Sequence, residues 1–274
     1  MSDPITVTGM SGAGNDFIVV GPAAIEALGA HPEDWVRRVC ARGVSLGADG
    51  VVFVQPRADE GIEVRFFNPD GSSAFCGNGS RCAARYAHLQ GMCGPRTTLW
   101  TEAGRIPAVV DAGNVRLELP PPEDGGLREV TSAGTAHRGR FVTAGIPHFI
   151  VFVDDPDTAP LESWGPALRR HPDFGEAGTN VNLAAFEDHR IRLRTWERGV
   201  ERETLCCWSG SVAVAYAARR EGAPESLTLR PASGIAVRVE LPGPPEAPTH
   251  AILEGEARVL FHGEVDPEAW AWPG

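Results

Sequence analysis

The chain has 274 residues, 42 % of them apolar, which is enough for one large domain or two of ordinary size. Its 25 basic and 36 acidic residues give a net charge of −11, which speaks against nucleic acid or an anionic membrane as a partner. The sequence contains no lysine, so a Schiff base with pyridoxal phosphate is excluded.

The first half of the chain reads as short strands with a few helices. An apolar spacing predicts a helix over 33–42, and an Ala-rich run predicts another over 80–89, opened by the tight turn Gly77-Asn78-Gly79. Apolar or alternating runs predict strands at 51–54, 62–67 and 115–119. The second of these strands ends in Asn68-Pro69-Asp70-Gly71, a strong turn sequence.

The second half follows a stretch rich in proline, glycine and acid, 120–126, which is the best candidate for a linker. Strands are predicted at 140–153, with an interruption at 145–147, and at 190–196 and 237–241. A helix is predicted over 211–220, opened by Trp208-Ser209-Gly210. No apolar run is long enough to span a membrane, and the N-terminus lacks the layout of a signal peptide, which favours a cytoplasmic location.

The two halves share an order of features. In each half an alternating strand and a polar turn precede a cysteine, Cys76 or Cys207, and a glycine, a serine and an Ala-rich helix follow. This predicts an α/β (α+β) chain of two pseudo-symmetric domains, each a mostly antiparallel sheet or barrel around a central helix. We expect residues 1–120 to carry Cys76, with a tail of about 263–274 packing back on them, and residues 127–262 to carry Cys207.

Six cysteines, at 40, 76, 82, 93, 206 and 207, could form disulfides in a secreted chain, but reduced thiols are expected here. Their spacing does not favour a zinc site, and we expect no metal. Cys40, Cys82, Cys93 and Cys206 are expected to be packing residues, because cysteine is usually buried and inert.

Cys76 and Cys207 are different because each precedes a helix. The free amides and the dipole at a helix start favour a thiolate, lower its pKa and can hold a carboxylate. Two such helices facing one interdomain cleft would place a sulfur on each face of an amino acid's α-carbon. One sulfur would remove the α-proton and the other would return one, so the centre would be inverted without a cofactor.

These motifs resemble those of the diaminopimelate epimerase family, nearly from end to end. The similar segments are Met10–Phe17 (MSGAGNDF), Gly47–Gly50 (GADG), Asn68–Ser72, Phe75–Cys82 (FCGNGSRC), Gly145–His148, Gly178–Asn182, Trp196–Val200 and Glu203–Ser211 (ETLCCWSGS). The resemblance implies epimerisation of LL- to meso-diaminopimelate, a step toward lysine and peptidoglycan precursors. It also implies a homodimer.

The resemblance further implies a role for each site residue. Cys76 and Cys207 would be the acid/base thiols. The amides of Gly77, Asn78, Trp208 and Ser209 would hold the reacting carboxylate. Asn15, Asn68 and Asn180 would orient the substrate, Glu197 would bind its distant ammonium and Arg198 its distant carboxylate. His148 is interpreted as a structural residue of the second domain.

Three positions depart from the family pattern. Gly9 stands where the family usually has a lysine before Met10. Ile146 stands where many members have asparagine. Trp208 stands where the family has a glycine directly after the second catalytic cysteine. If that position requires a positive φ, tryptophan would strain the turn by about 1–2 kcal/mol.

Alternatives remain open at this point. Trp208 and Ile146 could reshape the pocket for a racemase of another amino acid, such as histidine. Trp208 could also leave a catalytically impaired amino-acid-binding homologue. The presence of both Cys76 and Cys207 argues against the second alternative.

Overall fold

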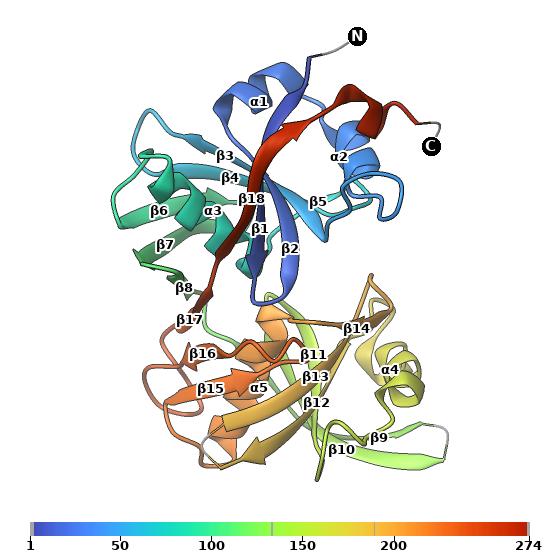
Figure 1. Cartoon of the computed structure of the whole chain (residues 1–274). Coiled ribbons are helices and arrows are strands. Elements are labelled where there is room, and N and C mark those ends of the chain that lie inside the picture. Colours follow the sequence, from blue (N-terminus) through green and yellow to red (C-terminus); the bar gives the residue numbers. More distant parts are fainter. Residues whose placement is uncertain (1–2, 133, 189, 273–274) are drawn as a thin grey trace. The chain divides into compact units, whose positions relative to one another are not determined.

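A computed structural model describes residues 3–132, 134–188 and 190–272 (Figure 1). The chain divides into two compact units. Unit 1 comprises Met1–Leu117 and Gly255–Gly274, and unit 2 comprises Glu118–Glu254. Both are mixed α/β structures built mostly of strands, as the sequence predicts.

The strands of unit 1 are joined in one sheet, and its helices lie between strands in the order of the chain. β18 pairs antiparallel with β1, β1 with β2, β3 with β4, β4 with β5, β6 with β7 and β7 with β8, whereas β2–β3 and β4–β6 are parallel. Its elements are β1 (Ile5–Gly12), β2 (Asn15–Val20), α1 (Pro22–Leu28), α2 (Glu33–Val39), β3 (Gly50–Pro56), β4 (Ile62–Phe67), β5 (Ser73–Ala74), α3 (Gly77–Leu89), β6 (Arg96–Thr101), β7 (Gly104–Asp111), β8 (Asn114–Leu119), β18 (Arg258–Val265) and η2 (Pro267–Trp270).

Unit 2 repeats this pattern. β9 pairs antiparallel with β10, β10 with β11, β12 with β13, β13 with β14, β15 with β16 and β16 with β17, whereas β11–β12 and β13–β15 are parallel. Its elements are β9 (Glu123–Ser132), β10 (Thr135–Ala144), β11 (Ile146–Phe152), α4 (Leu161–Arg169), η1 (Pro172–Phe174), β12 (Asn180–Glu187), β13 (Arg190–Glu197), β14 (Arg202–Thr204), α5 (Trp208–Arg220), β15 (Ser226–Arg230), β16 (Val237–Glu240) and β17 (Ala251–Glu256).

The two strand orders match element by element. β1 corresponds to β10, β2 to β11, β3 to β12, β4 to β13 and β5 to β14, and the helices α3 and α5 occupy the same place in each order. Parallel neighbours need a crossover connection, and each unit supplies two: one through α1 and α2 or through α4, and one through α3 or α5. The pseudo-symmetry predicted from the two cysteine motifs is therefore confirmed.

The two 13-residue helices α3 and α5 are the central elements of their units. α3 packs against β1, β2, β3, β4, β6 and β7, and α5 against β10, β11, β12, β13, β15 and β16. Every residue of α5 from Ser209 to Arg219 is buried, as is every residue of α3 from Gly77 to Ala84. A short, Ala-rich sequence suits this position because small side chains let a helix lie close to surrounding strands.

Apolar side chains outside these helices complete the cores. In unit 1, α1 and α2 pack on β1, β2 and β3, and Trp35 meets Trp270 of η2 edge to face with ring centroids 6.2 Å apart. In unit 2, Leu161 and Leu168 of α4 join Phe149, Leu183 and Trp196 in one cluster.

Some boundaries differ from the sequence expectations. Both central helices begin three residues earlier than predicted, so Gly77-Asn78-Gly79 and Trp208-Ser209-Gly210 form their first turns. The stretch 120–126 is not a free linker, because β9 begins at Glu123 and Asp124 is paired with Arg140 and Arg220. The chain returns to unit 1 at Gly255, earlier than the residue 263 expected, because β18 is a full strand paired with β1.

Candidate active site

Two cysteine side chains cap the two central helices. Cys76 has extended backbone angles, and its Sγ accepts the N–H of Gly79 at 3.4 Å. Cys207 is also extended, and its Sγ accepts the N–H of Gly210 at 3.4 Å. In both cases the sulfur takes the place of the oxygen that usually satisfies a free amide at a helix start. Each thiol is therefore fixed at the positive end of a buried helix.

A chain of polar contacts surrounds the start of α3 in unit 1. The side-chain amide of Asn78 donates to Oδ1 of Asn15 at 2.7 Å, and the amide of Asn15 donates to Oδ2 of Asp49 at 2.9 Å. Arg42 pairs with Asp49 at 2.9 Å. The structure thus brings Asn15 and Asn78 together at the helix that Cys76 caps. Asp49, which sequence reasoning missed, orients the amide of Asn15.

Asn68 lies in the turn that connects β4 to β5. Its side-chain amide donates to Oγ of Ser72 at 3.0 Å, and its backbone N–H donates to the carbonyl of Ser72 at 2.8 Å. These contacts fix the hairpin that leads directly to Cys76.

The start of α5 in unit 2 has a different set of neighbours. Oγ of Ser209 lies 3.4 Å from Sγ of Cys207 and 2.9 Å from Nε2 of His148. His148 is fully buried on β11. The resemblance left His148 as a structural residue, but it contacts the hydroxyl that bonds to the Cys207 sulfur.

Two further buried side chains fix the state of His148. Oγ1 of Thr195 donates to Oδ1 of Asn182 at 2.9 Å, and Nδ2 of Asn182 lies 3.0 Å from Nδ1 of His148. Because an amide nitrogen only donates, Nδ1 of His148 accepts and the neutral ring carries its proton on Nε2. That proton faces Ser209, so the Ser209 hydroxyl is left to donate to Cys207.

Burial decides the charge of the His148 ring and of the Cys207 thiol. Burial, followed by the positive charge of Arg198, lowers the pKa of His148 to about 3, so the ring is neutral at physiological pH. For Cys207, burial and then the carboxylate of Glu197 raise the pKa well above its usual value, while Ser209 and the Gly210 amide lower it. The expectation that the helix start would lower the pKa of this thiol is therefore wrong for Cys207, because desolvation outweighs the helix.

Three more of the expected residues gather near Cys207. Glu197 ends β13, close enough to act on the Cys207 pKa, and Arg198 begins the next turn, close enough to act on the pKa of His148. The backbone N–H of Arg198 donates to Oδ1 of Asn180 at 2.7 Å. Nδ2 of Asn180 is buried and has no partner among the residues described. Nδ2 of Asn180 is therefore a buried donor that remains available for a hydrogen bond inside unit 2.

The two helix starts rest on unlike surfaces. In the matched strand registers, Phe17, Val52 and Phe66 of unit 1 correspond to His148, Asn182 and Thr195 of unit 2. A Cβ on Gly79 would lie 3.4 Å from both Val52 and Phe66, whereas one on Gly210 would lie 2.6 Å from Oδ1 of Asn182. The first turn of α3 thus covers apolar side chains, and that of α5 covers a polar network.

Trp208 is accommodated without backbone strain. It is the first residue of α5, and neither Trp208 nor Gly77, its equivalent in α3, has a positive φ. A Cβ on Gly145 would lie 3.4 Å from Cη2 of Trp208, so the indole lies against the β10–β11 turn. The strain considered from the sequence is absent, because this position does not need the freedom of glycine.

The sequence held a signal for the residues that it failed to identify. Asn180 and Asn182 are alternate positions of the buried strand β12, and two amides on one face of such a strand require partners. His148 and Thr195 come from the strands on either side. Within the described residues, no three His, Cys, Asp or Glu side chains are grouped to hold a metal ion. The described helices include none that is long and apolar enough to cross a membrane.

Comparison with solved structures identifies the class of fold. The chain matches a hydroxyproline epimerase from Agrobacterium vitis with a TM-score of 0.74 at 18 % identity, covering 98 % of this chain and 95 % of the other. It matches a phenazine biosynthesis protein of the PhzF family from Bacillus anthracis with a TM-score of 0.71 at 15 % identity, covering 96 % and 99 %. The fold is therefore one shared by racemase-type and PhzF-type proteins.

Sequence comparison identifies the family. The family model for diaminopimelate epimerase matches residues 7–120 and 140–243. The chain is 34 % identical to a diaminopimelate epimerase of Aquifex aeolicus (94 % of this chain, 97 % of the other) and 38 % identical to one of Archaeoglobus fulgidus (94 % and 95 %). This chain belongs to the diaminopimelate epimerase family.

Proposed function

We propose that this protein converts LL-2,6-diaminopimelate to the meso form, using Cys76 and Cys207 as its two acid/base groups and no pyridoxal phosphate. The observation that carries this proposal is the repeated cap: in each unit a cysteine sulfur accepts the third amide of a buried central helix. Membership of the family supports the substrate. The alternatives, a racemase for another amino acid and an impaired homologue, are not favoured, because close relatives are diaminopimelate epimerases and the Trp208 backbone is unstrained.

The proposed reaction is a balanced exchange of protons. One sulfur, as a thiolate, breaks the Cα–H bond and becomes a thiol, and the electron pair spreads into the α-carboxylate. The other sulfur, as a thiol, gives its proton to the opposite face of the carbon and becomes a thiolate. The net charge of the pair is unchanged, and only the configuration of the carbon is inverted.

The resting state of Cys207 suits the role of proton donor. Burial keeps its pKa well above the usual value, so the thiol holds its proton until it faces a stronger base, such as the carbanion. The Ser209 hydroxyl then offers a hydrogen bond to the thiolate that remains. In the reverse direction the same hydrogen bond favours Cys207 as the base.

The amides of Gly77, Asn78, Trp208 and Ser209 would hold the reacting carboxylate. They belong to the first residues of α3 and α5, where the helix dipole favours an anion. These contacts strengthen as charge moves from the α-carbon into the carboxylate, which is what lowers the barrier. The side chain of Trp208 does not remove its amide from this set.

The far end of diaminopimelate carries a second ammonium and a second carboxylate. We assign Glu197 to the ammonium and Arg198 to the carboxylate. The buried donor Nδ2 of Asn180 supports a role for that residue in substrate binding. Asn15, fixed by Asp49 and Asn78, and Asn68, fixed by Ser72, would orient the substrate from unit 1.

Family membership also supports a proposal for the oligomeric state, the location and the partner of this protein. We propose a cytoplasmic homodimer whose partner is a small amino-acid substrate, with neither nucleic acid nor a membrane. The net charge of −11 supports the absence of an anionic partner.

Exchange of the α-hydrogen tests the reaction directly. Purified protein is incubated in D₂O with LL-diaminopimelate, or with histidine and other single amino acids, without added pyridoxal phosphate, and the α-protons are followed by NMR. Exchange with diaminopimelate is expected. Cys76→Ala and Cys207→Ala should each abolish inversion, whereas Cys206→Ala, at the adjacent buried thiol, should not. Exchange with another amino acid alone would overturn the assignment of substrate, and equal loss at Cys206 would overturn that of the thiol.

A further inference from the structure

Arg169, the last residue of α4, makes contacts in three directions. Its Nε donates to Oε1 of Glu201 at 2.7 Å, its Nη1 donates to the carbonyl of Ala177 at 3.2 Å, and its own carbonyl accepts the N–H of Thr179 at 3.1 Å. The side chain is only 15 % exposed. An arginine buried to this extent and bonded at two of its nitrogens has a single defined position.

One of these contacts fixes the turn that leads to Asn180. Gly178 in this turn has a φ of +67°, and a Cβ there would collide with the carbonyl oxygen of Arg169. Arg169 therefore holds the backbone on both sides of Gly178, through Ala177 and Thr179. Asn180, the next residue, begins β12.

The other contact fixes the turn that carries Arg198. Glu201, at the end of this turn, has a φ of +56°, and its backbone N–H donates to the carbonyl of Glu197 at 2.8 Å. The oxygen Oε1 that binds Arg169 also accepts the N–H of Gly199 at 3.2 Å. The carboxylate of Glu201 thus closes the turn over its own backbone and attaches it to Arg169.

The two turns also contact each other directly, because Oδ1 of Asn180 accepts the N–H of Arg198. Arg169 is thus connected to Arg198 through Glu201 and the 197–201 turn, and to Asn180 through the 177–179 turn. Removing the Arg169 side chain breaks its contacts with Glu201 and Ala177 at once and leaves only the backbone contact with Thr179.

We propose that Arg169 is a positioning residue for the distal end of the substrate: through Glu201 and the 177–179 turn it holds Arg198 and Asn180 in their binding geometry. This inference rests on the proposed function, because it presumes that Arg198 and Asn180 bind diaminopimelate. Arg169 itself touches no reacting atom.

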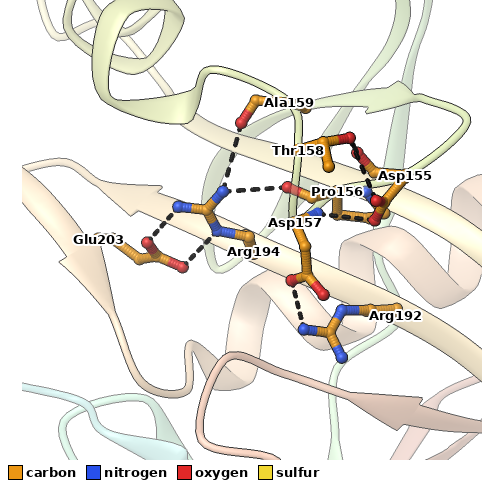
Figure 2. A network of polar contacts seen from close by, with 8 residues as sticks. All are labelled: Asp155, Pro156, Asp157, Thr158, Ala159, Arg192, Arg194 and Glu203. Carbon is orange, nitrogen blue, oxygen red and sulfur yellow. Dashed lines mark hydrogen bonds and ion pairs between the residues drawn. The ribbon is translucent and has the colours of Figure 1, made fainter.

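A second arginine–glutamate pair in the same hairpin provides a comparison (Figure 2). Arg194 donates from Nε and Nη2 to the two oxygens of Glu203 at 2.7 and 2.6 Å. Its Nη1 donates to the carbonyls of Pro156 and Ala159 at 3.0 and 3.3 Å. This pair joins β13 and β14 to the 156–159 loop. These contacts lie outside the turns that carry Asn180 and Arg198, so their loss removes a similar ion pair without releasing the two turns.

Steady-state kinetics of LL-diaminopimelate epimerisation separates positioning from simple support of the fold. A group that binds the distal end contributes equally to the ground state and the transition state, so its misplacement raises KM and leaves kcat unchanged. Arg169→Ala and Glu201→Ala should each raise KM by about ten-fold or more, because small displacements of a binding group are costly, with kcat within about three-fold of wild type. Arg169→Lys, which keeps the charge but not the two-directional contact, should fall in between.

Two control variants accompany these. Arg170→Ala removes the more exposed partner of Glu201 and should leave KM unchanged; Nη2 of Arg170 lies 3.1 Å from Oε2 of Glu201. Arg194→Ala should lower the thermal midpoint at least as much as Arg169→Ala without the rise in KM. If wild-type protein fails to exchange the α-proton, the proposed function is wrong. If wild type is active and KM of Arg169→Ala stays within two-fold, or rises equally in Arg194→Ala, the proposal for Arg169 is wrong.

Discussion

Nε2 of His148 on β11 lies 2.9 Å from Oγ of Ser209 in the first turn of α5, and both side chains are buried. This contact joins a neutral imidazole to the hydroxyl beside the Cys207 sulfur. It therefore links the chemistry of one thiol to residues on three strands of unit 2, His148 on β11, Asn182 on β12 and Thr195 on β13.

Ser209→Ala should raise the pKa of Cys207 further, because it removes a hydrogen bond that favours the thiolate. The pH at which Cys207 becomes reactive should therefore be higher in the variant than in wild type. Mass spectrometry of the Cys207 peptide, alkylated over a range of pH, would locate the midpoint. The matched control is Ser211→Ala, whose hydroxyl donates to the Cys207 carbonyl and not to the sulfur. Identical midpoints for the two variants would contradict the assigned role of Ser209.

His148 should make the protein sensitive to mild acid. The unfolded chain binds a proton at His148 below about pH 6.5, whereas the folded protein, with a pKa of about 3, does not. Between these two pH values the unfolded chain binds more protons than the folded protein, so lowering the pH favours unfolding. The contribution of the neutral His148 ring to the free energy of unfolding is therefore complete above pH 6.5 and is lost as pH falls toward 3. The loss is at most about 1.4 kcal/mol per pH unit.

Urea unfolding of wild type and His148→Gln at several pH values measures this effect. The free energy of unfolding should fall more steeply below pH 6.5 for wild type than for the variant. Above pH 7 the two curves should run parallel, because His148 is neutral in both the folded and unfolded states. Equal slopes below pH 6 would show that His148 can be protonated without unfolding.

Gly210→Ala should destabilise the protein, and Gly79→Ala should not. A Cβ at 210 would lie 2.6 Å from Oδ1 of Asn182, which Thr195 and His148 hold in place, so the polar network must shift. A Cβ at 79 would make ordinary contact, at 3.4 Å, with Val52 and Phe66.

The expected loss of unfolding free energy for Gly210→Ala is about 1–3 kcal/mol, the range for overpacking a core. For Gly79→Ala no loss is expected, since alanine is the better helix former. Denaturant unfolding of the pair measures the difference at equivalent positions of the repeat. Similar stabilities of the two variants would argue against a rigid polar network beneath α5.

Trp208→Gly tests the departure at the second catalytic cysteine. The amide that we assign to the reacting carboxylate is retained, so kcat should stay within about three-fold of wild type. The unfolding free energy should fall by about 1–3 kcal/mol, because the indole loses its contact with Gly145 and glycine is a poor helix former. A ten-fold rise in kcat/KM would instead show that the ring obstructs the substrate.

The sequence predicts the general fold because the features that specify it are local. A cysteine, a glycine and an Ala-rich helix after a strand and a turn are readable in each half, and the matching topologies of β1–β8 and β10–β17 confirm the duplication. The start of each helix was misplaced by three residues, because Gly-Asn-Gly and Trp-Ser-Gly look like turns when read without the cysteine sulfur that caps them.

The candidate site was only partly predictable. The motifs locate Cys207, Ser209, Glu197 and Arg198, but the network of His148, Asn182 and Thr195 depends on the registers of three strands. The direction of the Cys207 pKa shift was also out of reach, because it depends on complete burial of the thiol. The absence of backbone strain at Trp208 depends on its φ angle, which the glycine at this position in the family does not reveal.

The pairing of β1 with β18 has a consequence for synthesis on the ribosome. Unit 2 is one continuous stretch of chain, Glu118–Glu254, and all of its strands have been made before β18 exists. In unit 1, β1 can pair with β2 early, but it lacks its second neighbour until β18 (Arg258–Val265) has been made. Unit 2 is thus free to fold first, while β1 keeps an open edge that β18 closes later.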